Sequence, residues 1–510
     1  MTKIPRTILS SWLSIIVLIL MESGCAMLGP DHTTPEVELP KEWSAREGEF
    51  FQYPSSDEQV AWWTYFNDPI LDRLIGLTYS GNLTLQSAAI RILEARAQLA
   101  VVQGNLYPQS QEMNGDLFAI GSTGPADDRY YNSGSIGFDL GWEIDFWGKF
   151  RRAIESADAN LYGIVADYDD LLVSLTAEVA RTYINIRTIE ERIRLAKKNA
   201  ELQEESLNLV IVQLEAGLVT ELDVLQAKTL LSSTKSTIPA LEATLSKYSN
   251  SLAVLIGVLP GEISQLLGDS TGIPAMGRAI VMEIPAELLR RRPDIRRQEM
   301  QAAAQAAQIG IARAELFPSF TLFGSIGWSA NDRGVGSLGD IFESNSFSYS
   351  FGPAFRWNLF QYGRLKNQVR VQDARYQQTL LAYQNSVLNA AREVEDALST
   401  LSHTVIRAKY LLEGIKTSEK STELSMLQYQ EGLADYQRVL DATRSLTQKQ
   451  DQYAQTQGEI AASVVALYKA FGGGWQMPEQ RVRLPEEVQR EMSSRTDWGA
   501  QLPLVQAGEE

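Results

Sequence analysis

The side chains most capable of chemistry are few in this 510-residue chain, and none of them clusters at a catalytic spacing. Its two histidines are His32 and His403, and Cys25 is its single cysteine. A zinc site needs three or four closely spaced nitrogen, sulfur or carboxylate ligands, and a nucleophilic triad needs a base beside its nucleophile. The sequence supplies neither set. We therefore predict that the protein is not an enzyme and that it holds no metal and no cofactor.

The overall charge excludes another class of function. The formal net charge is −17, and charged residues make up 21% of the chain. A nucleic-acid-binding protein usually carries a basic surface, because phosphates repel an acidic one. We therefore expect no nucleic acid among the partners.

The N-terminal segment has the pattern of a secretory signal. An apolar run over residues 8–21 follows two basic residues, and it is too short for a dedicated membrane span. Glu22, Ser23 and Gly24 separate this run from Cys25, and a lone cysteine after a Ser-Gly pair resembles a bacterial lipobox with an acylated cysteine. Glu22 departs from the aliphatic residue usual three positions before that cysteine. Ala26 then favours sorting to the outer membrane. We predict a signal peptide over residues 1–24, acylation of Cys25, including palmitate, and an extended lipid-anchored arm over residues 25–67.

The stretch from Ser135 to Lys149 alternates between large apolar side chains and glycine or acidic ones. A period of two predicts a β-strand with one apolar and one polar face. Lipid on one face and water on the other would suit a transmembrane strand, whereas a half-buried strand of a soluble protein is the alternative. Residues 113–119, 320–329 and 347–359 show the same alternation, so the chain offers four strands.

Four strands cannot close a membrane barrel alone. Single-chain barrels begin at about eight strands, and an open sheet edge is not tolerated in lipid. Two chains would give eight strands and three chains would give twelve. Strand counting does not choose between them.

The pattern in the rest of the chain predicts long paired helices. Leucine and other apolar residues recur at heptad spacing over residues 172–200 and 231–255, which predicts packed helical hairpins. The helix from Lys149 to about residue 213 has about 64 residues and a length of roughly 96 Å. Shorter helices are expected over residues 220–257 and 294–317.

The two halves of the chain repeat each other. Trp142 and Trp357, Gly217 and Gly432, and Gly257 and Gly472 are pairs with a constant offset of 215 residues. A constant offset over this length predicts an internal duplication. The expected boundaries are a first repeat at 68–256, an equatorial linker at 257–293, a second repeat at 294–471 and a C-terminal equatorial segment at 472–510.

Carboxylates follow the two turns between the long helices. The plain explanation is helix capping, because acidic side chains near a helix N-terminus are stabilised there. The alternative is a gate, because charges repeated around a symmetry axis can narrow or select a pore. The candidate gate residues are Asp223, Asp435, Arg438 and Asp441, with Arg438 and Tyr429 as the nearest expected partners of the carboxylates.

One motif carries a specific family resemblance. Residues 284–299, Ile-Pro-Ala-Glu-Leu-Leu-Arg-Arg-Arg-Pro-Asp-Ile-Arg-Arg-Gln-Glu, closely resemble the signature of TolC-type outer-membrane factors in their lipoprotein (OprM/NodT-like) branch. Further matches are Gly-Pro-Asp at residues 29–31, Trp-Trp at 62–63 and the stretch at 467–475. The resemblance covers roughly residues 25–475.

The resemblance implies a mixed membrane β-barrel and α-helical fold. It implies a homotrimer whose twelve-stranded barrel continues into a twelve-helix periplasmic tunnel. The function implied is passive conduction across the outer membrane, as the exit duct of a tripartite resistance-nodulation-division (RND) efflux pump, with outer-membrane lipid, a periplasmic adaptor and an inner-membrane pump as partners. The alternatives are a type I protein-secretion duct, which has the same fold with a different inner-membrane partner, and a structural lipoprotein with a closed, non-conducting coiled coil.

The resemblance also implies roles for the two turns. In TolC-type proteins the helix tips close the periplasmic end. Asp223 and Asp441 fall where tip aspartates of that family lie, whereas Arg438 occupies a position that is acidic in TolC itself. Residues expected to contact the adaptor lie in the turns; they are Gly217, Leu218, Val219, Gly432 and Leu433.

Overall fold

The computed structural model describes residues 27–37, 43, 61–122, 129–269, 272–275, 286–332, 337–474, 484–499 and 502. The predicted signal peptide and Cys25 lie outside these residues, as do parts of the predicted arm, linker and C-terminal segment. The chain divides into two compact units. The first contains residues 1–36, 92–164 and 297–384, and the second contains residues 37–91, 165–296 and 385–510.

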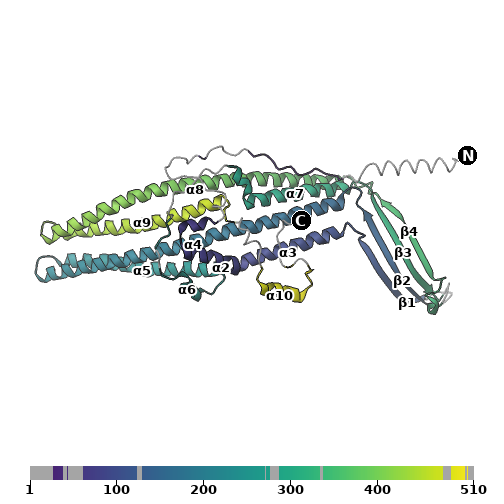
Figure 1. The fold of residues 1–510 in the computed structure, drawn as a ribbon, viewed down its shortest axis with the longest axis horizontal. Helices are drawn as coiled ribbons and strands as arrows, with labels where there is room; N and C mark the ends of the chain where they lie inside the picture. Colours follow the sequence, from purple (N-terminus) through teal and green to yellow (C-terminus); the bar gives the residue numbers. More distant parts are fainter. Residues whose placement is uncertain are drawn as a thin grey trace. The chain divides into compact units, whose positions relative to one another are not determined.

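The first unit holds a four-stranded antiparallel sheet in the order β1-β2-β3-β4 (Figure 1). Its strands are β1 (Ser110–Ser122), β2 (Arg129–Ile144), β3 (Ser319–Asn331) and β4 (Phe347–Arg356). The four predicted strands are therefore confirmed. The fourth is shorter than expected, since β4 ends at Arg356. Trp357 lies just beyond the strand, and its indole Nε1 donates to the carbonyl oxygen of Leu316 at 3.1 Å.

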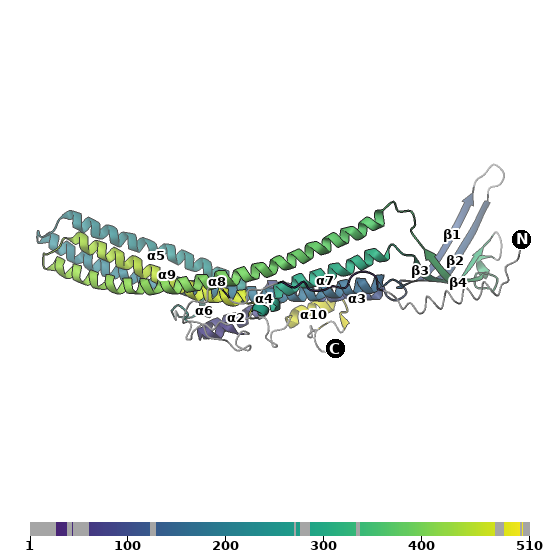
Figure 2. The same ribbon diagram turned by 90° about the horizontal axis from the view of Figure 1, so that it is seen from above.

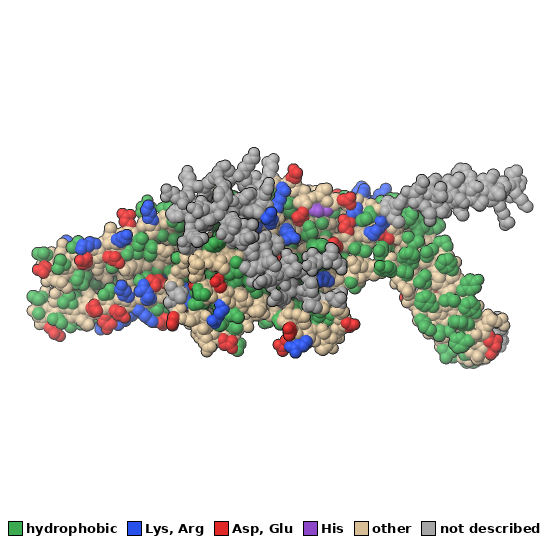
Figure 3. All heavy atoms as spheres, viewed as in Figure 1, with side chains coloured by type: hydrophobic (Ala, Val, Ile, Leu, Met, Phe, Trp, Pro, Cys, Tyr) green, Lys and Arg blue, Asp and Glu red, His purple; other side chains and the backbone are tan. Residues whose placement is uncertain are grey.

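The register of the sheet places an apolar row next to a polar row near its middle. One row across the four strands consists of Met113, Phe138, Ile326 and Tyr349. The adjacent row consists of Glu112, Asp139, Ser325 and Ser350. Because side chains alternate between faces, these rows belong to opposite faces. Hydrophobic side chains gather over the sheet on the face seen in Figure 3.

Two helical hairpins have their turns in the second unit, and the long helix of each begins in the first. In the first, α4 (Lys149–Glu215) is followed by α5 (Glu221–Ile256), and in the second, α8 (Arg364–Gln430) is followed by α9 (Tyr436–Ala470). The paired helices run side by side in both Figure 1 and Figure 2. The expected long helix and its shorter return are thus confirmed. The long helices α4 and α8 have 67 residues each, whereas the returning helices α5 and α9 have 36 and 35.

The helical stretch expected over residues 68–104 is two helices. Asp68 begins α2 (Pro69–Gly81), and its carboxylate accepts from the backbone N–H of Ile70 at 3.0 Å. Asn82 then breaks the helix with an extended backbone, and α3 (Leu83–Gly104) follows. The Asn82 side chain donates to the carbonyl oxygen of Leu255 at 2.8 Å and accepts from the N–H of Leu85. These bonds replace those lost at the break.

Short helices occupy the described parts of the segment expected to be an irregular linker. They are η3 (Pro260–Glu262), α6 (Ile263–Leu267) and η4 (Ala286–Arg291), and α7 (Pro293–Ala314) follows them. The described remainder of the chain adds η2 (Trp62–Phe66), η5 (Leu338–Asp340) and α10 (Glu486–Arg495).

A buried polar chain ties the short elements of the second unit to α4. The fully buried Arg187 donates to the carbonyl oxygen of Leu267 at 2.7 Å and to the hydroxyl of Tyr183 at 3.0 Å. That hydroxyl donates to Asp68 at 2.6 Å. Because a buried guanidinium is costly unless its donors are satisfied, this chain fixes α2 and α6 at one level of α4.

Within the described residues, no single helix combines the length and apolar character of a membrane span. By length and composition alone, the bent pair Glu221–Ile256 and Pro260–Leu267 meets that criterion, with an angle of 109° between its parts.

Candidate functional site

The two turns of the second unit end their helices in the same way. Gly217 and Gly432 have φ angles of +73° and +71°, which glycine adopts at little cost. The next residue in each turn donates back into the preceding helix. Leu218 N–H reaches the Gln213 carbonyl at 2.9 Å, and Leu433 N–H reaches the Gln428 carbonyl at 2.8 Å. This pattern stops each helix sharply and reverses the chain within a few residues.

In the first turn, Asp223 serves the start of α5. Its carboxylate accepts from the backbone N–H of Thr220 at 2.9 Å and from the hydroxyl of Thr220 at 2.8 Å. Thr220 is the N-cap residue of α5, so Asp223 makes the return bond of a capping box. The capping explanation thus holds for Asp223.

In the second turn, Asp435 occupies the N-cap position of α9, but its side chain makes no capping hydrogen bond. Its Oδ1 lies 4.0 Å from the Arg438 Nε, and both side chains are about 70% exposed or more. The capping explanation therefore does not account for the Asp435 carboxylate.

Asp441 pairs within its own helix. Its Oδ1 accepts from Arg444 and from Gln437, each at 3.2 Å. Of the two candidate partners for the turn carboxylates, Arg438 lies near Asp435 and not near Asp441. Long helical side chains lean toward the helix N-terminus, so Arg438 leans toward Asp435 and Arg444 leans toward Asp441.

Beneath the turns, residues from all four helices form one apolar cluster. Its buried members are Val210 of α4, Ala227 of α5, Tyr429 of α8, and Tyr436, Val439 and Leu440 of α9. The rings of Tyr429 and Tyr436 lie 5.1 Å apart between centroids. The Tyr436 hydroxyl is 2.9 Å from the Ser206 Oγ. The cluster joins the two hairpins just below the turns.

Tyr429 is buried and lacks the expected hydrogen bond to a turn carboxylate. Its hydroxyl has no hydrogen-bond partner among the described residues. Burial, together with the nearby charge of Asp223, raises the pKa of Tyr429 to about 12. Burial also raises the pKa of Tyr436, which is opposed by its bond to Ser206 and reinforced by Asp223. Both phenols therefore remain neutral donors near Asp223.

The turn residues expected to contact an adaptor divide into two groups. Leu218 and Leu433 are 74% and 78% exposed, which leaves one large apolar side chain projecting from each turn. Val219 instead packs against the cluster beneath the turns. Exposed leucines at matching positions are available for a partner, and Val219 is mainly structural.

Two residues at the turns were not predicted from the sequence, which are Arg444 and Tyr436. Arg444 could have been found from its position three residues after Asp441. Tyr436 could not have been found from its spacing to Tyr429, because the two residues lie on different helices, α9 and α8. The described residues contain no group of three or more His, Cys, Asp or Glu that could hold a metal ion.

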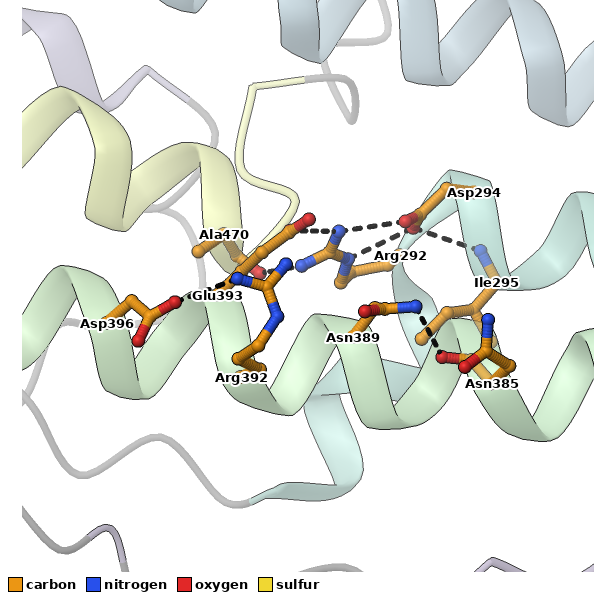
Figure 4. A network of polar contacts seen from close by, with 9 residues as sticks. All are labelled: Arg292, Asp294, Ile295, Asn385, Asn389, Arg392, Glu393, Asp396 and Ala470. Carbon is orange, nitrogen blue, oxygen red and sulfur yellow. Dashed lines mark hydrogen bonds and ion pairs between the residues drawn. The ribbon is translucent and has the colours of Figure 1, made fainter.

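The signature stretch 284–299 centres on Arg292 in the structure (Figure 4). Its side chain is 8% exposed and donates to both carboxylate oxygens of Asp294, at 3.0 and 2.8 Å. It also donates to Glu393 of α8 at 2.8 Å and to the carbonyl oxygen of Ala470, the last residue of α9, at 2.6 Å. One guanidinium thus joins η4, α7, α8 and the C-terminus of α9.

Comparison with known proteins assigns the chain to a family. The family model described as outer membrane efflux protein matches residues 74–258 and 284–473. The chain belongs to this family. The predicted membership of the OprM/NodT-type outer-membrane factors is confirmed.

Relatives cover nearly the full chain. Nodulation protein T of Rhizobium leguminosarum bv. viciae is 32% identical over 93% of this chain and 96% of its own length. The pyoverdine export outer membrane protein OpmQ of Pseudomonas putida is 32% identical over 81% of this chain and 88% of its own. The structure of the outer-membrane channel OprN matches with a TM-score of 0.82 and 32% identity, over 89% of this chain and 100% of that one. The combination of long helices and a four-stranded sheet is therefore that of an outer-membrane channel.

Proposed function

We propose that this protein is the outer-membrane exit duct of a tripartite efflux pump. It passively conducts substrates received from a periplasmic adaptor and an inner-membrane RND pump to the cell exterior. Family membership and the similarity to the pyoverdine exporter OpmQ support export, rather than type I protein secretion, as the function.

The main support for this proposal is the structure of the four-stranded sheet. Its strands have 10 to 16 residues, its rows alternate between apolar and polar, and β1 and β4 each have an unpaired outer edge within the described residues. Strands of this length suit a bilayer, and lipid does not tolerate open edges. Three copies would close these edges in a twelve-stranded barrel, with their hairpins forming a twelve-helix tunnel.

The test is the mass of the detergent-solubilised protein. Native mass spectrometry should give a trimer, and cross-links between β1 of one copy and β4 of the next should close the ring. A stable monomer that conducts ions in a bilayer would rule out the shared barrel.

We also propose that Cys25 is acylated after removal of residues 1–24 and that the anchor lies in the outer membrane. Support comes from the sequence pattern and from family membership. Mass spectrometry of the mature N-terminal peptide should show the added acyl groups, and Cys25→Ser should remove them. An unmodified N-terminal peptide in the membrane fraction would contradict the anchor.

The turns are proposed as the periplasmic gate and the adaptor contact. Asp435, Arg438 and Asp441 are exposed and pair only within α9 among the described residues, so their charges remain available to neighbouring copies. Asp223 would act chiefly by holding the start of α5. Leu218 and Leu433 offer the apolar contact for the adaptor, with Gly217 and Gly432 setting the turns.

The proposed boundaries are those expected from the sequence, with repeats at 68–256 and 294–471 joined by the linker at 257–293. The positions of the long helices support a duplication. The bounds Lys149–Glu215 and Arg364–Gln430 differ by 215 residues at both ends. This is the offset found between the two halves of the sequence.

A further inference from the structure

Residues of the N-terminal arm are bound by one buried arginine of the first unit. The Arg152 side chain, on α4, is 3% exposed. Its Nε donates to the Leu28 carbonyl at 3.0 Å, and its Nη2 donates to the Gly29 carbonyl at 3.3 Å and to the Asp31 carboxylate at 2.8 Å. Its Nη1 donates to Glu155 at 2.6 Å, which fixes the guanidinium on its own helix. Arg152 therefore binds mainly the backbone of the arm.

Around Arg152, the arm and the neighbouring backbone approach so closely that glycines are needed at the contacts. Gly29 has a φ of +102°, and a Cβ there would lie 2.6 Å from the Gly310 Cα of α7. A Cβ on Gly310 would in turn collide with the Leu28 carbonyl oxygen. Gly148 is equally close to Met27, where an added Cβ would lie 2.9 Å from the Met27 Cα. The arm and the helices thus approach each other backbone to backbone.

The arm makes further polar contacts on both sides of this point. The Leu28 N–H donates to the Trp147 carbonyl at 3.2 Å, three residues after the end of β2. Farther along, the His32 Nδ1 lies 3.3 Å from the Tyr376 hydroxyl of α8, and the Thr34 hydroxyl donates to Glu299 of α7 at 2.5 Å. The contacts run without a gap of more than two residues from Met27 to Thr34.

We propose that Arg152, Gly148 and Gly310 form a docking site for residues 27–34 that fixes where the anchor on Cys25 enters the membrane. Cys25 lies three positions before Leu28, so the two Cα atoms are at most about 11 Å apart. Because the Leu28 N–H is bonded to Trp147, three residues beyond the end of β2, the acyl group is attached near that end of the strand. Arg152 is a positioning residue, and it holds the arm whether or not Cys25 is acylated. This consequence rests on the proposed lipid anchor, whereas the docking itself does not.

Hydrogen exchange of the full-length, detergent-solubilised protein tests the proposal. The peptide covering residues 27–34 should be protected in the wild type and equally protected in Cys25→Ser. Arg152→Gln should raise its exchange rate by about tenfold or more, because the charged donor to three acceptors is lost. Arg152→Lys should lose most of the protection, since one ammonium cannot replace the planar guanidinium. The control is Arg194→Gln on the same helix, an exposed residue paired with Glu191, which should leave the peptide unchanged.

Gly29→Ala supplies an independent test if Arg152→Gln fails to assemble. The added Cβ removes the close approach to Gly310 without leaving a buried charge, so the arm should lose protection while the trimer persists. Unchanged protection in Gly29→Ala and in any assembled Arg152 variant would overturn the docking site. Loss of protection in Cys25→Ser alone would also overturn it, because the lipid would then position the arm. The mass of the N-terminal peptide reports acylation separately, so failure of the lipid anchor is distinguished from failure of the docking site.

Discussion

At the scale of single residues, side-chain direction decides which charges pair. Arg438 and Arg444 lie at equal distances in sequence on either side of Asp441, yet only Arg444 bonds to it. Each arginine reaches back toward the N-terminus of α9, as long helical side chains do. The pair Asp435 and Arg438 is thereby separated from the pair Asp441 and Arg444. The turn carries two independent ion pairs rather than one shared charge network.

We expect the attachment of the arm to depend on pH through His32. Burial lowers the pKa of His32 below its ordinary 6.5, and this is opposed in part by the charge of Glu299. The groups that face the ring are Tyr376 from α8 and Glu299 from α7. A free arm binds a proton at a higher pH than the docked arm does, so docking is full above the free pKa and weakens as the pH falls below it.

We therefore expect hydrogen exchange at residues 27–34 to become faster, relative to intrinsic exchange, as the pH falls from about 7 to about 5. His32→Gln should flatten this dependence, because it retains a polar side chain that does not titrate. A profile equally steep in His32→Gln would assign the pH effect to another group.

At the scale of the elements, we expect Arg292 to stabilise mainly the C-terminal end of α9. Arg292→Met leaves Asp294, Glu393 and the C-terminal carbonyl of α9 without their shared cation. Breaking a buried pair costs about 3 to 5 kcal/mol, and the partial exposure of both carboxylates reduces this to about 2 to 3 kcal/mol. We expect a lower thermal midpoint and faster hydrogen exchange at the end of α9.

Arg392→Met is the matched control for this prediction. Arg392 lies next to Glu393 on α8 and pairs with Asp396, and both side chains are more than half exposed (Figure 4). Such a pair contributes about 0 to 1 kcal/mol. If this variant lost as much stability as Arg292→Met, general charge loss rather than the Arg292 bonds would be responsible.

Periodic patterns predicted the elements well because they report the two faces of a strand or helix. The alternation over residues 135–149 and the heptads of the long helices gave the correct element types. The sequence could not give the break at Asn82, because that residue is held out of the helix by a bond to Leu255, 173 residues away. For the same reason, the contacts of Arg292 and Arg152 could not be predicted from the sequence. Apart from Asp294 and Glu155, their partners come from distant segments, and no local spacing brings those together.

At the scale of the whole molecule, symmetry determines what the turn charges can do. A single exposed ion pair is worth about 0 to 1 kcal/mol, which is too little to hold a channel closed. In the proposed trimer each of these charges occurs three times, so their contacts with neighbouring copies would add around one axis. Asp223 is a poor residue for testing this idea, because removing its bonds to Thr220 also weakens the start of α5.

The double variant Asp435→Ala and Asp441→Ala should therefore raise the single-channel conductance of the purified trimer in planar bilayers. Neither residue belongs to the apolar cluster beneath the turns or to a strand, so assembly should persist and can be checked by native mass spectrometry. The control is Asp170→Ala on α4, which should leave the conductance unchanged. An assembled double variant that conducts like the wild type would show that these carboxylates serve α9 alone. The constriction would then have to be sought elsewhere in the channel.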